Sequence, residues 1–118
     1  MRKEKAKSVI LKYVIKEGRK MTRQVTLSVN DQPIALDYFV QNFIDHTICG
    51  ILTSLEGAGE MHDVEVSVEG DNLTINLNNT LLPTNFFVTK IIRNTIVGMV
   101  SSLKGVGEID KVNIIIKR

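Results

Sequence analysis

The order of hydrophobic and polar positions along the chain predicts a short succession of strands and a helix. Apolar and polar residues alternate over 25–29, which is typical of a strand with one buried face. The polar pair at 30–31 predicts a tight turn, and a short extended piece follows at 33–36. Residues 37–55 carry apolar side chains at helical spacing. Another alternating segment at 64–68 predicts a closing strand.

The same succession occurs a second time. Shifting the chain by 48 residues aligns 25–68 with 73–116 without a gap, and 14 of the 44 aligned pairs are identical. Asp37 and Asn85 occupy equivalent places as the expected helix N-caps. Residues 69–72 are expected to join the two units as a hairpin. A repeat of this kind indicates a tandem duplication, which determines the architecture.

The long elements therefore follow the order β-α-β-β-α-β, which indicates the α+β class. We expect tandem duplicated ββαβ units that form a ferredoxin-like antiparallel sheet with two helices on one face. The opening hairpin followed by a helix also resembles a β-grasp, which is the alternative. Residues 24–118 are expected to form a single domain made of two repeats, 24–71 and 72–118.

Each predicted helix has one apolar face, which we expect to lie on the sheet. The faces comprise Val40, Phe43, Ile44, Thr47, Ile48, Ile51 and Leu55 in the first helix, and Val88, Ile91, Ile92, Thr95, Ile96, Met99 and Leu103 in the second. Beside each face lies a stripe of small residues, Thr47-Gly50-Ser54 and Thr95-Gly98-Ser102. Since a glycine within a helix is destabilising, its recurrence predicts that the two helices cross closely there; a small-ligand groove is the alternative.

Charge separates the two repeats. Residues 24–71 contain nine acids and no Lys or Arg, for a net charge of −9, whereas residues 72–118 contain six bases and two acids, for +4. This asymmetry predicts either drift on a solvated surface or complementary pairing between repeats of two chains. The predicted partner surface comprises Asp45, Cys49, Glu56, Lys90, Arg93, Val97 and Lys104. A second expected contact surface is the sheet face that carries Ser28, Gln32, Glu65, Ser67, Asn76 and Asn113.

Residues 1–23 form a basic extension outside the repeat. Residues 1–20 contain eight bases and two acids, for a net charge of +6. Such an arm could bind nucleic acid through phosphates, and residues 8–15 could instead add a strand. A third interpretation is an untranslated leader, because residues 16–18 can be encoded by a ribosome-binding sequence ahead of Met21. We expect no nucleic-acid partner unless the arm is translated.

No catalytic, cofactor or metal signature is recognisable in the sequence. The loop that ends each unit contains a Gly-x-Gly-Glu motif but lacks the third glycine of a dinucleotide fingerprint and leaves a helix rather than entering one. We expect Gly57 and Gly105 to end the helices, and Glu60 and Glu108 to lie at the same end of the sheet. His46 and Cys49 share a helix surface, but two ligands do not make a zinc site. The expected ligand-site residues are Gly57, Gly59, Glu60, Gly105, Gly107 and Glu108.

The functional expectation is a small, non-enzymatic, cytoplasmic interaction module that acts by self-association or as a subunit. The single cysteine excludes an intramolecular disulfide, and no apolar run is long enough to span a membrane. The alternatives are a regulatory domain that binds a small molecule at the Gly-x-Gly-Glu loops, and nucleic-acid binding through the basic arm. We expect a homo-oligomer or a protein partner, and no catalytic residues, metal or cofactor.

Overall fold

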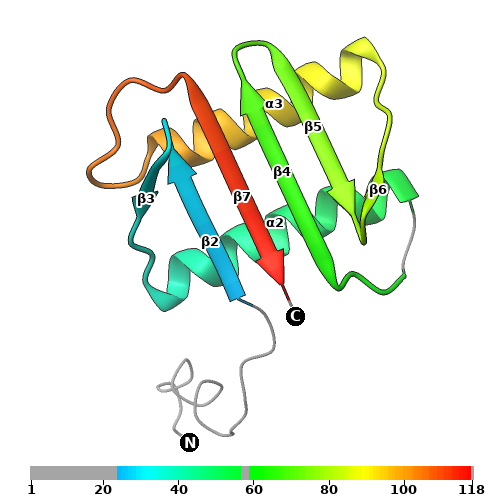
Figure 1. The fold of residues 1–118 in the computed structure, drawn as a ribbon, viewed down its shortest axis with the longest axis horizontal. Coiled ribbons are helices and arrows are strands. Elements are labelled where there is room, and N and C mark those ends of the chain that lie inside the picture. Colours follow the sequence, from blue (N-terminus) through cyan, green and yellow to red (C-terminus); the bar gives the residue numbers. More distant parts are fainter. Residues whose placement is uncertain (1–23, 57–58, 118) are drawn as a thin grey trace, which may run out of the picture.

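The computed structural model describes residues 24–56 and 59–117, which form one six-stranded antiparallel sheet with two helices. The basic extension and Gly57 lie outside the described residues. The elements are β2 (Gln24–Val29), β3 (Gln32–Ile34), α2 (Tyr38–Glu56), β4 (Asp63–Glu69), β5 (Asn72–Leu77), β6 (Thr80–Leu81), α3 (Phe86–Ser101) and β7 (Lys111–Lys117). The predicted α+β class and antiparallel sheet are confirmed. Figure 1 shows the strands with both termini of the domain at one end.

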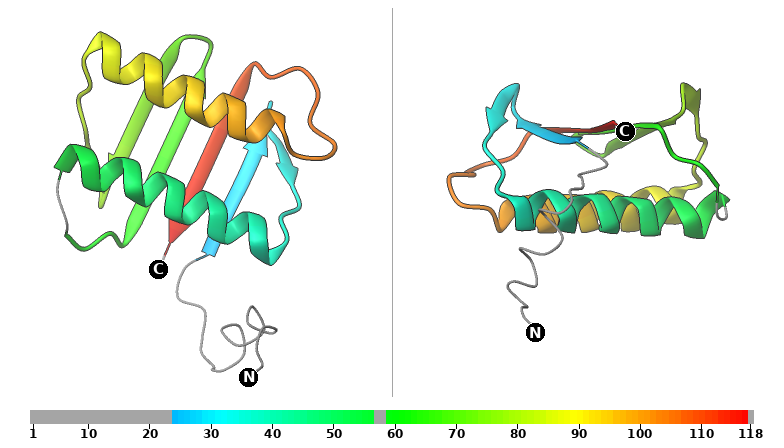
Figure 2. Two further views of the ribbon diagram at one scale, coloured as in Figure 1. Left: turned by 180° about the vertical axis from the view of Figure 1, so that it is seen from behind. Right: turned by 90° about the horizontal axis from the view of Figure 1, so that it is seen from below.

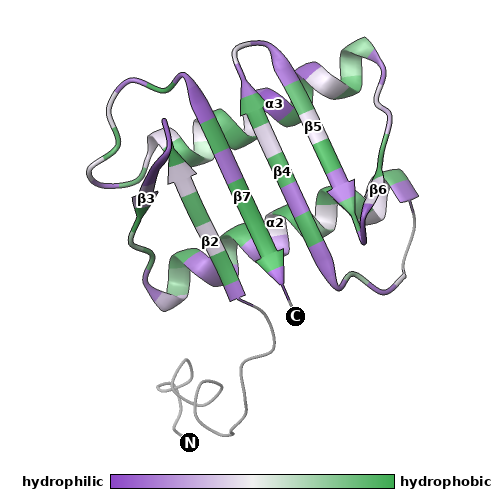
Figure 3. Cartoon of the chain, in the orientation of Figure 1, coloured by the Kyte–Doolittle hydropathy of each residue, from purple (hydrophilic) through white to green (hydrophobic). Residues whose placement is uncertain are grey.

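The two helices run antiparallel on the same side of the sheet, so its other side carries no helix (Figure 2). Strand positions alternate between the two sides, and Figure 3 shows this as alternating hydrophobic and hydrophilic bands. The positions that face the helices form the core, in which the side chains of β4 and β7 are at most 2% exposed. These side chains are Val64, Val66, Val68, Val112, Ile114 and Ile116.

The strand order corrects the ferredoxin-like expectation. The sheet runs β3-β2-β7-β4-β5-β6, so the closing strand of each unit lies in the centre. A ferredoxin-like sheet has the opening strands there instead. The β-grasp alternative also fails, because β2 and β7, the first and last long strands, pair antiparallel rather than parallel. The strands with the most completely buried side chains, β4 and β7, thus lie at the centre of the sheet, whereas Leu73 and Leu77 on β5 remain half-buried.

The local signals in the sequence act as predicted at the turns and helix starts. Asn30 and Asp31 have φ values of 52° and 66°, which suit the expected two-residue hairpin turn. Gly70, with φ 61°, lies in the hairpin between β4 and β5. The side-chain oxygens of the two N-cap residues, Asp37 and Asn85, accept hydrogen bonds from backbone amides three residues later, each at 2.8 Å.

Candidate interaction surface

The helices bury a narrower stripe than the sequence predicts. In α2 the fully buried side chains are Ile44, Ile48 and Leu52, spaced four residues apart. In α3 the equivalent stripe is Ile92, Ile96 and Val100. Residues on the opposite side of each helix therefore point away from the sheet. This rotation places two residues of the predicted buried faces, Phe43 and Ile91, on the outside with half of each side chain exposed.

All four phenylalanines of the chain are exposed on or beside the helices. Phe39 and Phe87 are equivalent under the 48-residue shift, and each is 67% exposed. Phe43 and Ile91 are also equivalent, and each is 50% exposed. Phe39 and Phe43 stack on each other with ring centroids 6.0 Å apart. Phe86, which precedes Phe87, is 82% exposed.

The small-residue stripes lie on the same outward side, so the predicted close crossing of the two helices is wrong. A Cβ atom added to Gly50 or to Gly98 would meet no heavy atom within 4 Å. The hydroxyls of Ser54 and Ser102 donate back to the carbonyls of these glycines at 3.1 Å. We define the helix outer face as the outward surface formed by Phe39, Phe43, Gly50, Ser54, Phe87, Ile91, Gly98 and Ser102.

We expect Gly50→Ala and Gly98→Ala each to raise the free energy of unfolding by about 0.5–1 kcal/mol, because alanine limits the unfolded backbone and meets no neighbour. Denaturant titration at a protein concentration far below any dimer dissociation constant measures the effect on the isolated chain. A loss of stability in either variant would show that a neighbouring group occupies the space beside the glycine.

The predicted partner surface divides into two groups in the structure. Asp45 is only 7% exposed, and the Cys49 thiol donates to its carboxylate at 3.3 Å. Cys49 and Val97 are half-buried and pack against the core, which corrects their expected place on an exposed partner surface. Arg93 is half-buried, and its Nε donates to the Gly70 carbonyl at 2.7 Å. The remaining three residues, Glu56, Lys90 and Lys104, are exposed.

The two Gly-x-Gly-Glu loops do not form one site. Glu60 precedes β4 and Glu108 precedes β7, and these strands pair antiparallel with Asp63 opposite Lys117. Their starting points, and with them Glu60 and Glu108, therefore lie at opposite ends of the sheet, which corrects the expectation of a shared end. Glu60 instead contacts His62, with 2.8 Å between the carboxylate Oε1 and the imidazole Nε2, at an exposed position.

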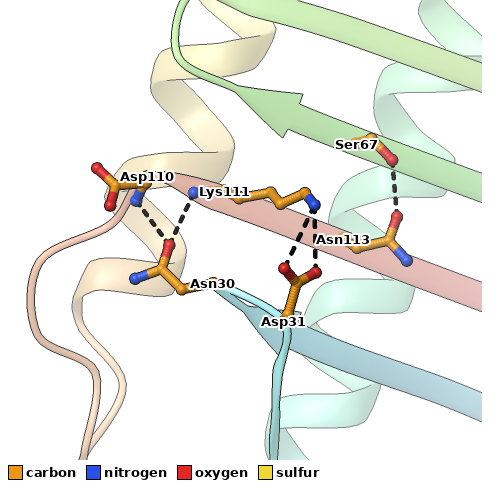
Figure 4. A network of polar contacts seen from close by, with 6 residues as sticks. All are labelled: Asn30, Asp31, Ser67, Asp110, Lys111 and Asn113. Atoms are coloured by element: carbon orange, nitrogen blue, oxygen red, sulfur yellow. Dashed lines mark hydrogen bonds and ion pairs between the residues drawn. The ribbon is translucent and has the colours of Figure 1, made fainter.

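Each of these loops is held by an asparagine from a distant turn. We call the three hydrogen bonds that each asparagine side chain makes an asparagine clasp. The Asn30 side-chain oxygen accepts from the amides of Asp110 and Lys111 at 2.8 and 2.9 Å, and its Nδ2 donates to the Glu108 carbonyl at 2.9 Å. Figure 4 shows the two accepted bonds, together with the ion pair between Lys111 and Asp31.

The second asparagine clasp repeats the first at the other end of the sheet. The Asn78 oxygen accepts from the amides of His62 and Asp63 at 2.8 and 3.0 Å, and its Nδ2 donates to the Glu60 carbonyl at 2.9 Å. Each of the three partners of Asn30 lies 48 residues after the corresponding partner of Asn78. Asn30 and Asn78, which are identical in the repeat alignment, therefore have the same structural role. The alignment alone did not reveal that role.

The helix-free side of the sheet is mainly polar and carries five of the six residues predicted for a second contact surface. One row runs across the four long strands through Ser28, Asn113, Ser67 and Thr74. In this row the Ser67 hydroxyl donates to the Asn113 side-chain oxygen at 2.7 Å (Figure 4). Gln32, the sixth residue, lies on the exposed edge strand β3. Because side chains in this row already hydrogen-bond one another, they are a weaker candidate for a contact surface than the apolar helix outer face.

Two shallow cavities lie beside the N-terminal half of α3. One, of about 580 Å³, lies between the start of β5 and the segment after β6, and the other, of about 340 Å³, lies beside Phe86 and Lys90. Asp71 and Thr89 line both. The only cationic groups in the second cavity are Lys90 and Arg93, and Arg93 already binds the hairpin carbonyl of Gly70. The Thr89 hydroxyl, which lines both cavities, hydrogen-bonds the Thr84 hydroxyl at 2.5 Å.

Among the described residues, no group of three or more His, Cys, Asp or Glu side chains is placed to hold a metal ion. In the same part of the chain, neither helix has the length and apolar character that crossing a membrane requires. The polar contacts described above thus belong to turns, helix caps and the two clasps. They do not explain the exposed apolar side of the helices. The chain matches no protein-family model, no curated protein and no solved structure.

Proposed function

We propose that the protein is a non-catalytic interaction module that associates with itself through the helix outer face. The observation that carries the proposal is the exposure of all four phenylalanines. Single exposed apolar residues are common on monomers, but clusters of them are typical of an interaction surface, and here one cluster lies in the N-terminal half of each helix. Burying one such side chain contributes about 1.5–3 kcal/mol, so the three phenylalanines of the helix outer face represent a large unused driving force for association.

The equivalence of the two helices supports self-association in particular. A twofold dimer uses the same surface patch on both partners, so it needs a patch that can complement itself. The helix outer face has equivalent apolar residues on both helices, with the same exposure in each pair, Phe39 with Phe87 and Phe43 with Ile91. The single cysteine suits the reducing cytoplasm that we propose as the protein's location.

We also infer that the domain is a tandem duplication of one ββαβ unit. The strand register supports this inference, because β4 and β7 pair around Val66 opposite Ile114, which are equivalent residues. The flanking pairings repeat as well: Thr26 lies opposite Ile115, and Thr74 lies opposite Ser67. The two units are thus related by a local twofold axis through the centre of the sheet.

The experiment is sedimentation equilibrium of the 118-residue chain over a wide concentration range. We expect the average mass to rise from that of one chain to that of two. Phe43→Ser should raise the dimer dissociation constant about 30-fold, since about 2 kcal/mol of burial is lost across the interface. The melting temperature of dilute protein should change little, because the Phe43 side chain is already half exposed in the single chain.

The matched control is Leu81→Ser, which removes another exposed apolar side chain (62% exposed) from β6 rather than from the helix outer face. It should leave the dissociation constant unaltered. Wild-type protein that keeps the mass of one chain at every concentration would refute the proposal. An equal effect of Phe43→Ser and Leu81→Ser would show that the association is not through the helices.

A further inference from the structure

We infer that the partner on the helix outer face is a second copy docked with its α2 against α3 of the first, and its α3 against α2. This inference rests on the proposed function and adds the pairing of the helices. It follows from three properties of the helix outer face, namely its area, the distribution of large and small side chains, and the sign of the charges at its rim.

The area requires both helices to take part. α2 has 19 residues, which corresponds to a length of about 28 Å, and two helices side by side are about 20 Å wide. The flat area is therefore about 560 Å², compared with about 800 Å² per partner in a typical stable interface. Even allowing for side-chain relief, a contact through one helix alone would be too small. The whole helix layer of each copy must face that of the other.

The distribution of side-chain sizes makes the face complementary to itself. In each helix the large exposed residues lie in the N-terminal half and the glycine and serine lie in the C-terminal half: Phe39 and Phe43 against Gly50 in α2, with the same order in α3. When two such helices face each other antiparallel, the rings of one lie over the glycine and serine of the other. The open space above Gly50 and Gly98 can receive them.

Two twofold arrangements give antiparallel facing helices. In the unlike arrangement, α2 faces α3 of the partner, because α2 and α3 are antiparallel within one chain (Figure 2). In the like arrangement, α2 faces α2 of the partner and α3 faces α3. Side-chain size does not distinguish them, because both helices have the same division into a large half and a small half.

Charge distinguishes the two arrangements. α2 contains Asp45 and Glu56 but no Lys or Arg, whereas α3 contains Lys90 and Arg93 but no Asp or Glu. In the unlike arrangement, Glu56 at the end of α2 lies beside the partner's Lys90 near the start of α3. The like arrangement places Glu56 beside the partner's Asp37, which is the acidic N-cap of α2. Opposite charges at the rim favour the unlike arrangement and specify its register.

Because Glu56 and Lys90 carry opposite charges, charge-reversing substitutions at low salt distinguish the unlike arrangement from the like arrangement. If the helices pair as unlike, Glu56→Lys should raise the dimer dissociation constant roughly tenfold, because two attractive contacts per dimer become repulsive. Lys90→Glu should do the same, and the double variant Glu56→Lys with Lys90→Glu should restore the wild-type value. The differences should shrink in concentrated salt, which screens exposed charges.

The matched control is Glu65→Lys, which makes the same change of charge on the helix-free side of the sheet. It should leave association unchanged. If Glu56→Lys tightens the dimer, the like arrangement holds and the inference is overturned while the proposed function stands. A dimer indifferent to Glu56→Lys also overturns it.

A wild-type chain that stays monomeric refutes both the inference and the proposed function. Binding of that monomer to neutral phosphatidylcholine vesicles, in a flotation assay, would assign the phenylalanines to a lipid surface instead.

Discussion

Ile96→Ala is expected to lower the free energy of unfolding by about 2–5 kcal/mol, the largest single effect on the isolated chain among the variants proposed. Ile96 is completely buried between α3 and the sheet, so truncation removes apolar burial and leaves a cavity. Ile91→Ala is the same substitution five residues earlier in the same helix, but the Ile91 side chain is half exposed. The change at Ile91 should be no more than about 0.5 kcal/mol.

Chemical denaturation of both variants at a concentration below the dimer dissociation constant measures this contrast. The comparison tests the orientation of α3 directly, because the sequence pattern places both isoleucines on the buried face. Equal losses at the two positions would mean that α3 is rotated from the orientation described above, and the helix outer face would then be incorrectly assigned.

Asn78→Ala is expected to cost about 2–3 kcal/mol, the second largest effect, because three hydrogen bonds disappear at once. These bonds hold the chain before β4 against the turn after β5. Alanine also tolerates poorly the left-handed backbone at this position, where φ is 51°. Urea denaturation monitored by circular dichroism gives the loss, and Asn30→Ala should behave similarly at the opposite end of the sheet.

Asn78→Gly separates the two causes, since glycine adopts positive φ without strain and lacks only the side chain. We expect it to recover part of the loss and to remain about 1–2 kcal/mol below wild type. Asn79→Gly, at the neighbouring position with φ 67°, removes no recorded side-chain bond and should leave stability unchanged or higher. A full recovery in Asn78→Gly would show that backbone strain, and not the clasp, accounts for the effect of alanine.

The features that the sequence predicted correctly depend on local chemistry. The asparagine-rich turns, the N-caps and the alternating strands each follow from residues that are neighbours along the chain. Gly105 adopts the expected left-handed conformation, with φ 87°, although α3 ends earlier, at Ser101. These signals fix the type and approximate limits of the elements. They do not determine how the elements are placed in space.

The orientation of the helices was mispredicted because their apolar residues cover more than half of the circumference. Phe43 and Ile44 are adjacent and equally plausible as core residues, and only packing against the sheet selects Ile44. A repeating spacing of four, at 44, 48 and 52, was the available signal. The strand order could not be predicted, because the order of the elements along the chain does not specify whether the strand after a helix joins the centre or the edge.

The two short strands at the sheet's borders limit how the protein can assemble. β3 has three residues, including Pro33, and β6 has two and is followed by Pro83. Proline has no amide hydrogen to donate, and strands this short offer little backbone for another chain to pair with. Edge-to-edge growth into fibrils is therefore blocked at both borders. Under the proposed twofold docking, the helix outer face of each chain is buried against that of the other, so the assembly should close at two chains.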